Sequence, residues 1–149
     1  FVYGPLVFSK ATAQFTSFLY QNVQTMAAFG FAKSPLVTRR GDAPDASQDE
    51  LVVIASPFFP HRLATGYSNP AFTVVQAVNG TPVRSLKHLV ALLRDMKAEF
   101  VSLETNNRGG ETMVFPHKDM LASVEDILND NGVRAQGTPA LMEVWKAKP

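Results

Sequence analysis

The chain has 149 residues, of which 46% are hydrophobic and 18% are charged. This composition supplies enough apolar side chains for a buried core and too few charges for a disordered chain. The net charge of +1 offers no general attraction to a polyanion, which argues against nucleic acid as a partner. The absence of cysteine excludes disulfides, thiolate nucleophiles and cysteine-based zinc sites, and it leaves the cellular compartment open.

The first eight residues, FVYGPLVF, are strand-like and begin without an initiator methionine, so we interpret the chain as a fragment of a longer protein. Pro5 favours a sheet edge or the start of a strand. No apolar run approaches the ~20 residues that a membrane-spanning helix needs. We therefore expect no transmembrane segment in this fragment.

An amphipathic helix is predicted from Thr12, which can serve as its N-cap, to Gly30. Its apolar residues recur at intervals of three and four and are expected in the core: Phe15, Phe18, Leu19, Val23, Met26 and Ala27. Residues 33–50 are rich in proline and small polar residues, which predicts an exposed connection with Arg39 and Arg40 at a solvated tip.

The rest of the chain mixes short strands and helices. Strands are predicted at residues 51–55, 72–78, 100–104 and 112–115, and helices at residues 85–97, 119–131 and from Thr138 through Trp145. Ser85 is the expected N-cap of the first of these helices, whose apolar face is Leu86, Leu89, Val90 and Leu93. The apolar face of the second is Met120, Leu121, Val124, Ile127 and Leu128, and the last begins with a Thr138 cap and Pro139 and carries Leu141, Met142 and Trp145. Asn79 and Gly80 favour a tight turn with positive φ, and the glycines at 109 and 110 indicate a hairpin turn. The strands are too few for a doubly wound sheet, so the predicted fold class is α+β with a small, mostly antiparallel sheet.

Catalysis needs a nucleophile beside a base, and His61, His88 and His117 are the candidate bases near neutral pH. The sequence contains no G-x-S-x-G elbow and no G-[DN]-S-G-G segment of a trypsin-like protease. The three histidines also lack the spacing of metal ligands. We therefore predict no catalytic residue, no metal site and no cofactor within this fragment.

Residues 74–95, VVQAVNGTPVRSLKHLVALLRD, resemble the part of a PDZ domain in which a strand and an Asn-Gly turn precede the helix that walls the peptide groove. In detail they are similar to the second, C-terminal PDZ domain of the plant-type Deg branch of HtrA serine proteases. Two other segments resemble the same domain: GPLVF at residues 4–8 and EDILNDNGV at residues 125–133. The resemblance spans residues 4–133 in pieces.

This resemblance implies a PDZ-like small antiparallel sheet or partial barrel with flanking helices. The PDZ-like domain would cover residues 1–133, with a helical and loop insertion at residues 11–50, and residues 134–149 would form a C-terminal helical tail. The resemblance also implies a non-catalytic module of an HtrA/Deg-type serine endopeptidase of protein quality control, whose trypsin-like catalytic domain lies outside this fragment. The full-length protein would be a homo-oligomer, in the cell envelope of a bacterium or in a plant-like organelle.

The implied activity is peptide binding by strand addition, in which an extended segment adds to the edge of residues 6–9. The implied site residues are Gly4, Pro5, Leu6, Val7, Phe8, His88 and Leu92. Residues 88 and 92 are four apart and share a helix face, as a groove wall requires. The expected partners are therefore protein or peptide segments, including a segment of the domain's own oligomer.

Two residues depart from the usual PDZ pattern. Pro5 stands where a glycine is usual, and Val7 occupies the position of the second glycine of the carboxylate loop. Because proline has no N–H to offer a carboxylate, capture of a free C-terminus is disfavoured. Two alternatives stay open: an assembly domain with an occluded groove and with Phe58, Phe59 and Trp145 at an interface, or an unrelated small enzyme.

Overall fold

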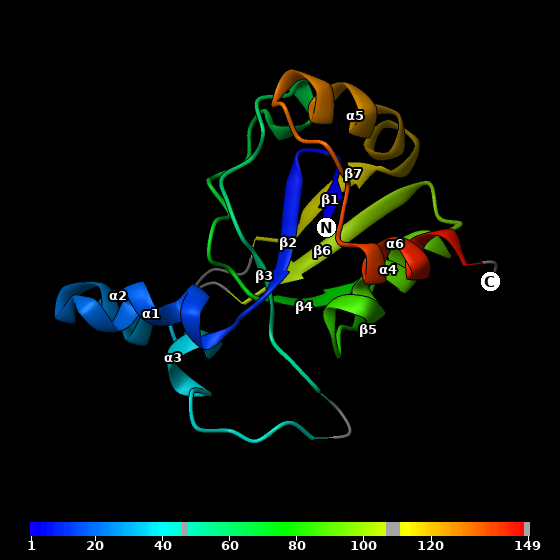
Figure 1. The fold of residues 1–149 in the computed structure, drawn as a ribbon. Helices are drawn as coiled ribbons and strands as arrows, with labels where there is room; N and C mark the ends of the chain where they lie inside the picture. Colours follow the sequence, from blue (N-terminus) through cyan, green and yellow to red (C-terminus); the bar gives the residue numbers. More distant parts are fainter. Residues whose placement is uncertain (46–47, 107–110, 148–149) are drawn as a thin grey trace.

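Two antiparallel sheets that meet at one corner form the centre of the computed structural model, which describes residues 1–45, 48–106 and 111–147. The strands are β1 (Val2–Tyr3), β2 (Leu6–Lys10), β3 (Val52–Ile54), β4 (Val75–Val78), β5 (Thr81–Pro82), β6 (Phe100–Thr105) and β7 (Met113–Pro116). The helices are α1 (Ala13–Gln21), α2 (Val23–Phe31), α3 (Pro35–Thr38), α4 (Leu86–Arg94), α5 (His117–Asp130), α6 (Pro139–Lys146) and the 3-10 helix η1 (Arg62–Ala64). Figure 1 shows α1 and α2 projecting to one side of the sheets, with α4 and α6 together on the other side.

The first sheet has the strand order β1-β2-β3. β1 and β2 form a hairpin around Gly4 and Pro5, with Val2 opposite Val7. Gly4 has a φ of 54°, a conformation that glycine adopts without the steric penalty of a side chain. The other edge of β2 pairs with β3. β2 is therefore the central strand of this sheet, although the resemblance implies an edge at residues 6–9. Pro5 instead stands directly before the start of the strand, the other position that this proline favours.

The second sheet has the strand order β5-β4-β6-β7. Asn79 and Gly80, with φ values of 47° and 76°, make the predicted tight turn between β4 and β5. A single bridge between Val53 and Val74 joins β3 to the chain before β4, so the two sheets are continuous at this corner. The predicted glycine-rich turn between β6 and β7 lies outside the described residues at 107–110.

α4 packs against both sheets and supplies one face of the main core. As predicted, the Ser85 side chain accepts a hydrogen bond from the His88 N–H and caps the helix. The apolar stripe of α4 is buried as predicted: Leu86, Leu89, Val90 and Leu93. The helix ends at Arg94, before the predicted limit.

The mixed helices and antiparallel sheets confirm the α+β class.

α5 buries Met120 and Ile127, but it leaves Leu121, which the sequence places on the same apolar face, 41% exposed. α6 starts at Pro139 as predicted and buries Leu141 in the main core, so the C-terminal segment packs against the body of the domain.

The single helix predicted over residues 12–30 is two helices in the structure, and the burial predicted for its second half is wrong. Thr12 caps α1, but the chain breaks at Asn22, whose Oδ1 accepts hydrogen bonds from the N–H groups of Gln24 and Thr25 and starts α2. Leu19 of α1 is buried in a second, smaller core cluster. α2 turns the rest of the predicted stripe to solvent: Val23, Met26 and Ala27 are all exposed.

The connection after α2 has more structure than the sequence predicts. Ser34 caps the short helix α3 by accepting from the Leu36 N–H. At the predicted solvated tip, Arg40 is exposed and its guanidinium lies 3.9 Å from the centre of the Tyr20 ring, whereas Arg39 is half-buried.

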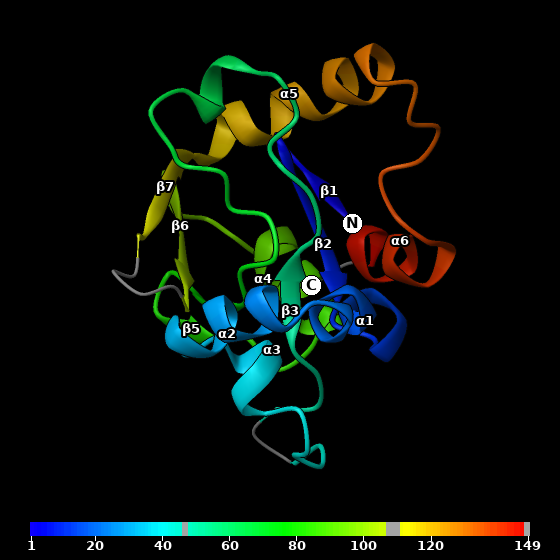
Figure 2. The same cartoon turned by 90° about the vertical axis from the view of Figure 1, so that its left-hand side faces the viewer.

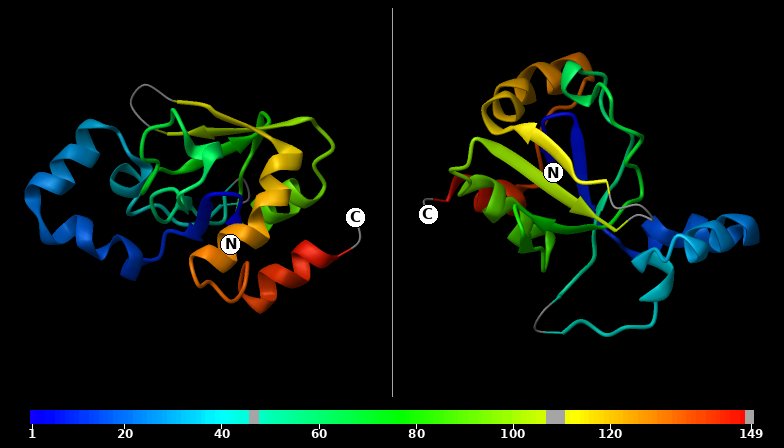
Figure 3. Two further views of the ribbon diagram at one scale, coloured as in Figure 1. Left: turned by 90° about the horizontal axis from the view of Figure 1, so that it is seen from above. Right: turned by 180° about the vertical axis from the view of Figure 1, so that it is seen from behind.

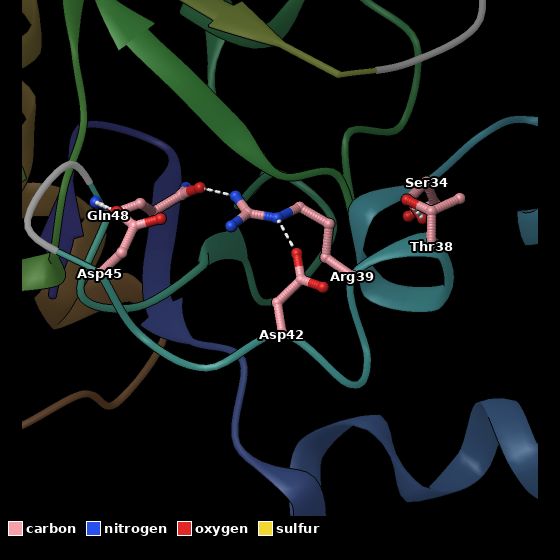
Figure 4. A network of polar contacts seen from close by, with 6 residues as sticks. All are labelled: Ser34, Thr38, Arg39, Asp42, Asp45 and Gln48. Carbon is pink, nitrogen blue, oxygen red and sulfur yellow. Dashed lines mark hydrogen bonds and ion pairs between the residues drawn. The ribbon is translucent and has the colours of Figure 1, made fainter.

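Figure 4 shows the polar network that follows α3. Arg39 Nε donates to Asp42 at 2.7 Å, and Arg39 Nη1 donates to Gln48 Oε1. The backbone N–H of Gln48 donates to Asp45 Oδ1 at 2.9 Å. One arginine thus ties together the two ends of this part of the connection.

Candidate functional site

The outer edge of β2 already carries a strand of the same chain. Phe1 and Phe8 exchange both backbone hydrogen bonds, since the Phe8 N–H donates to the Phe1 carbonyl at 2.8 Å and the Phe1 nitrogen donates to the Phe8 carbonyl at 2.7 Å. The pairing is antiparallel, with Tyr3 opposite Leu6. Residues 1–3 therefore satisfy the groups that an added peptide strand would need.

β1 is also held from its other side. The Val2 N–H donates to the Gln136 carbonyl at 2.7 Å, and Gln136 Nε2 donates to the Val2 carbonyl at 3.0 Å. These two bonds give β1 backbone partners on both edges. They also connect the start of the chain to the segment between α5 and α6.

α6 covers β1 with an aromatic ring. The centroid of the Trp145 ring lies 5.2 Å from that of Phe1 and 6.3 Å from that of Tyr3. α6 is fixed to α4 by the Arg94 side chain, which donates to the Val144 carbonyl at 2.7 Å. Figure 2 shows α6 beside the N-terminal strand. Trp145, which the assembly alternative places at an interface, closes this side of the core.

The turn between β1 and β2 has few groups for a ligand. The Pro5 carbonyl accepts from the Phe59 N–H at 2.9 Å, and Pro5 has no N–H of its own. Gly4 lies against α5 so closely that a Cβ added there would stand 2.5 Å from the sulfur of Met120. Pro5 therefore offers no donor at this turn, and its carbonyl already has a partner.

The α4 wall contributes the two other predicted site residues. His88 Nδ1 accepts from the Arg84 N–H at 3.2 Å, so one ring nitrogen is already bonded to the backbone just before α4. Burial, and next the positive charge of Arg84, lower the pKa of His88, while Asp49 acts in the opposite direction. Leu92 is half-buried and packs against the main core.

The structure thus places the predicted site residues on two elements. Five of them form one hairpin strand and its turn, with Leu6 and Phe8 fully buried and Val7 half-buried. His88 and Leu92 lie on α4, which packs against β2. The sequence interpretation missed Gln136 and Trp145 as residues that hold β1. Trp145 lies on the apolar face predicted for the last helix, but nothing in the sequence indicates that Gln136 bonds to Val2.

Two buried polar atoms lie close to this site. Tyr3 is fully buried, and its hydroxyl has no hydrogen-bond partner among the described residues. The same holds for Nε2 of His117, whose ring centroid is 6.5 Å from that of Tyr3. Burial raises the pKa of Tyr3 far above its ordinary value, so the phenol is neutral.

In the described parts of the chain, no three His, Cys, Asp or Glu side chains stand close enough to hold a metal ion. His61 caps η1, since its Nδ1 accepts from the Leu63 N–H. His88 and His117 occupy the positions on α4 and α5 given above. The helices that the structure describes include none that is long and apolar enough to cross a membrane.

Comparison with protein families finds that the model of a PDZ domain family matches residues 1–139. The match covers most of the chain and includes both walls of the site, β2 and α4. It confirms the PDZ-like fold expected from residues 74–95. No curated protein matches the chain.

Proposed function

Since this chain belongs to the PDZ domain family, whose members bind peptides or proteins, we propose that it is an interaction module that uses its groove internally. Residues 1–3 occupy the strand edge, and α6 covers α4. The domain thus holds its own segment where a peptide would add, and it serves assembly and regulation of a larger protein more than capture of free C-termini.

The mutual hydrogen bonds between Phe1 and Phe8 carry this proposal. An extended ligand gains affinity in strand addition from the main-chain groups of the edge strand. At Phe8 both of those groups already have partners at 2.7 and 2.8 Å. A free peptide must first displace β1, together with its bonds to Gln136 and its contact with Trp145. This displacement lowers the apparent affinity by the fraction of molecules in which the edge is open.

We propose further that the larger protein is an HtrA/Deg-type serine endopeptidase, with this chain as a non-catalytic domain. The segments VNG at residues 78–80 and GPLVF at residues 4–8 support this assignment. The site residues Gly4, Pro5, Leu6, Val7, Phe8, His88 and Leu92 would then line the internally filled groove.

A peptide-binding experiment tests internal use of the groove. Fluorescence anisotropy would be measured with a library of extended peptides, each with a free and an amidated C-terminus, on the wild type and on Trp145→Ala. We expect no binding to the wild type up to about 100 μM and a gain of at least about tenfold in affinity on removing the ring over β1. Leu92→Arg in the Trp145→Ala background should abolish the gained binding, because it puts an unpaired charge into the groove.

The opposite result would be micromolar binding to the wild type that disappears on amidation. It would mean that the edge is open and that the turn at Pro5 does accept a carboxylate. The parent assignment has a separate test in the full-length coding sequence. We expect an upstream domain with a His, an Asp and a G-x-S-G segment, and its absence would remove the HtrA/Deg assignment.

A further inference from the structure

α2 presents a large apolar surface to solvent. Val23 is 77% exposed, Phe31 is 75% exposed and Met26 is 37% exposed. Of the nine residues of α2, all of which the structure describes, none is buried. Single exposed apolar residues are ordinary, but three large ones on one short helix mark an interaction surface.

The exposed residues share one face of the helix. Val23, Ala27 and Phe31 follow one another at intervals of four, and Met26 lies at the edge of this face, three positions from Val23 and three from Phe29. The opposite side is fixed to the domain, since Phe29 packs in the second core cluster with its ring 6.5 Å from Phe18. The body of the protein therefore holds α2 by one face and leaves the other uncovered.

This surface carries no charge. The sequence has no Asp, Glu, Lys or Arg anywhere in residues 11–32, although 18% of the whole chain is charged. A helix that only faces water normally has a charged outer side. The lack of basic residues on α1 and α2 also separates this face from helices that lie on anionic membranes, because those are rich in Lys and Arg on the polar side.

A second copy of the chain fits these observations. At a two-fold interface each residue stands near its own symmetry mate, so any charge near the axis would meet a like charge. The three positions Val23, Ala27 and Phe31 are symmetric about Ala27. If two α2 helices pair antiparallel with the axis at Ala27, Val23 of each copy meets Phe31 of the other. Figure 3 shows that α1 and α2 project from the sheets, which lets two such arms meet with the bodies apart.

We infer that the outer face of α2 is a self-association surface, which pairs antiparallel with the same face of a second copy across an axis at Ala27. A nine-residue helix covers less than the roughly 800 Å² per partner of a standard interface. The pairing is therefore weak in the isolated chain and gains strength where other contacts already bring copies together. The biological role of this contact rests on the assembly function proposed above. The contact itself is argued from the residues of α2 alone.

Disulfide trapping tests this geometry, because the natural chain has no cysteine. Ala27→Cys places a thiol at the axis, and the neighbouring Ala28→Cys is the matched control. Both alanines are exposed, but residue 28 lies about 100° further round the helix. Under mild oxidation we expect the covalent dimer to form at least about tenfold faster with Ala27→Cys, because only there does pairing bring the two thiols within bonding reach. Equal rates would overturn the inference.

A charge variant adds an independent readout. Phe31→Glu in the Ala27→Cys background should reduce trapping to the rate of Ala28→Cys, while Gln14→Glu, which adds the same charge to an exposed site on α1, should not. Flotation with anionic phospholipid vesicles checks the other partner. Binding of the wild type to vesicles that is lost in Phe31→Glu, without faster trapping at residue 27, would assign the face to lipid. The peptide-binding assay above should give the same result for all these variants, so failure of one proposal is distinguishable from failure of the other.

Discussion

The Tyr67 hydroxyl donates to the Val114 carbonyl at 2.7 Å and accepts from the Val114 N–H at 3.0 Å. Val114 lies in β7, the last strand of the second sheet, so one side chain occupies backbone groups at the free edge of that sheet. The outer edge of β2 is closed by a strand and that of β7 by a phenol. Both devices leave fewer unpaired backbone groups for another chain to pair with.

Tyr67→Phe should lower the free energy of unfolding by about 0.5–1.5 kcal/mol, the range for loss of a hydrogen bond. The ring remains, so its packing on Phe115, with centroids 5.1 Å apart, is kept. Urea denaturation measures the change. No loss of stability would mean that water replaces the hydroxyl at Val114 without penalty.

Tyr3→Phe also removes a phenolic oxygen, but it should change the free energy of unfolding in the opposite direction. The Tyr3 hydroxyl is buried without a partner among the described residues, so the folded state loses its hydration and gains no bond in exchange. We expect the free energy of unfolding to rise by about 1 kcal/mol. A fall of similar size in urea denaturation would show that the hydroxyl is bonded, for example through a buried water to His117.

Much of the local structure could be predicted because its signals are local. Thr12 and Ser85 cap the helices that follow them, and Asn79 with Gly80 forms the turn that these residue types favour. The occupant of the β2 edge could not be predicted in this way. Gln136 bonds to Val2 across a separation of 134 residues, and only the folded chain brings these two residues together.

The wrong prediction of one continuous buried helix over residues 12–30 has a similar cause. The periodicity of residues 15–27 is that of one buried helix face, and it is correct as far as Leu19. Asn22 then interrupts the helix and redirects it, because its side chain caps the next one. The apolar residues keep the same spacing through α2, but the break at Asn22 decides whether they face the core or the solvent. The same spacing therefore describes core in α1 and an uncovered surface in α2.

Leu89→Ala should lower the free energy of unfolding by about 2–5 kcal/mol, as for other large-to-small changes in a core. Leu89 is fully buried in α4 between the two sheets. Leu121→Ala is the matched control, because Leu121 is 41% exposed on α5 and loses much less buried surface. Similar losses from the two variants in chemical denaturation would contradict the packing of α4.

His88 should make stability depend on pH. Burial and the charge of Arg84 lower its pKa in the folded state, so the folded protein binds this proton more weakly than the unfolded chain. The stability that neutral His88 contributes to the folded state is present above its ordinary pKa of about 6.5 and is lost as the pH falls through the lowered pKa of the folded state. We expect thermal stability to decrease between about pH 7 and about pH 5, and to decrease less in His88→Gln. Equal slopes for the two proteins would exclude this role.

Gly4→Ala should be more damaging than Gly80→Ala, although both glycines have positive φ. At Gly80, with a φ of 76°, an added Cβ meets nothing within 4 Å, so only the backbone conformation is penalised, by about 1 kcal/mol. At Gly4 the same atom would stand 2.5 Å from the sulfur of Met120, which is fully buried and must move. We expect the loss at Gly4 to exceed that at Gly80 by about 1–3 kcal/mol in chemical denaturation.

A double-mutant cycle identifies the contact responsible. If Met120 causes the excess, Gly4→Ala combined with Met120→Ala should be less destabilising than the sum of the two single changes, by about 1 kcal/mol or more. Strict additivity would place the strain elsewhere in the hairpin. Because the Gly4 turn sets β1 against β2, Gly4→Ala should also loosen the internal strand and admit peptides that the wild type refuses. Gly80→Ala, at a turn away from β1, should leave peptide binding unchanged.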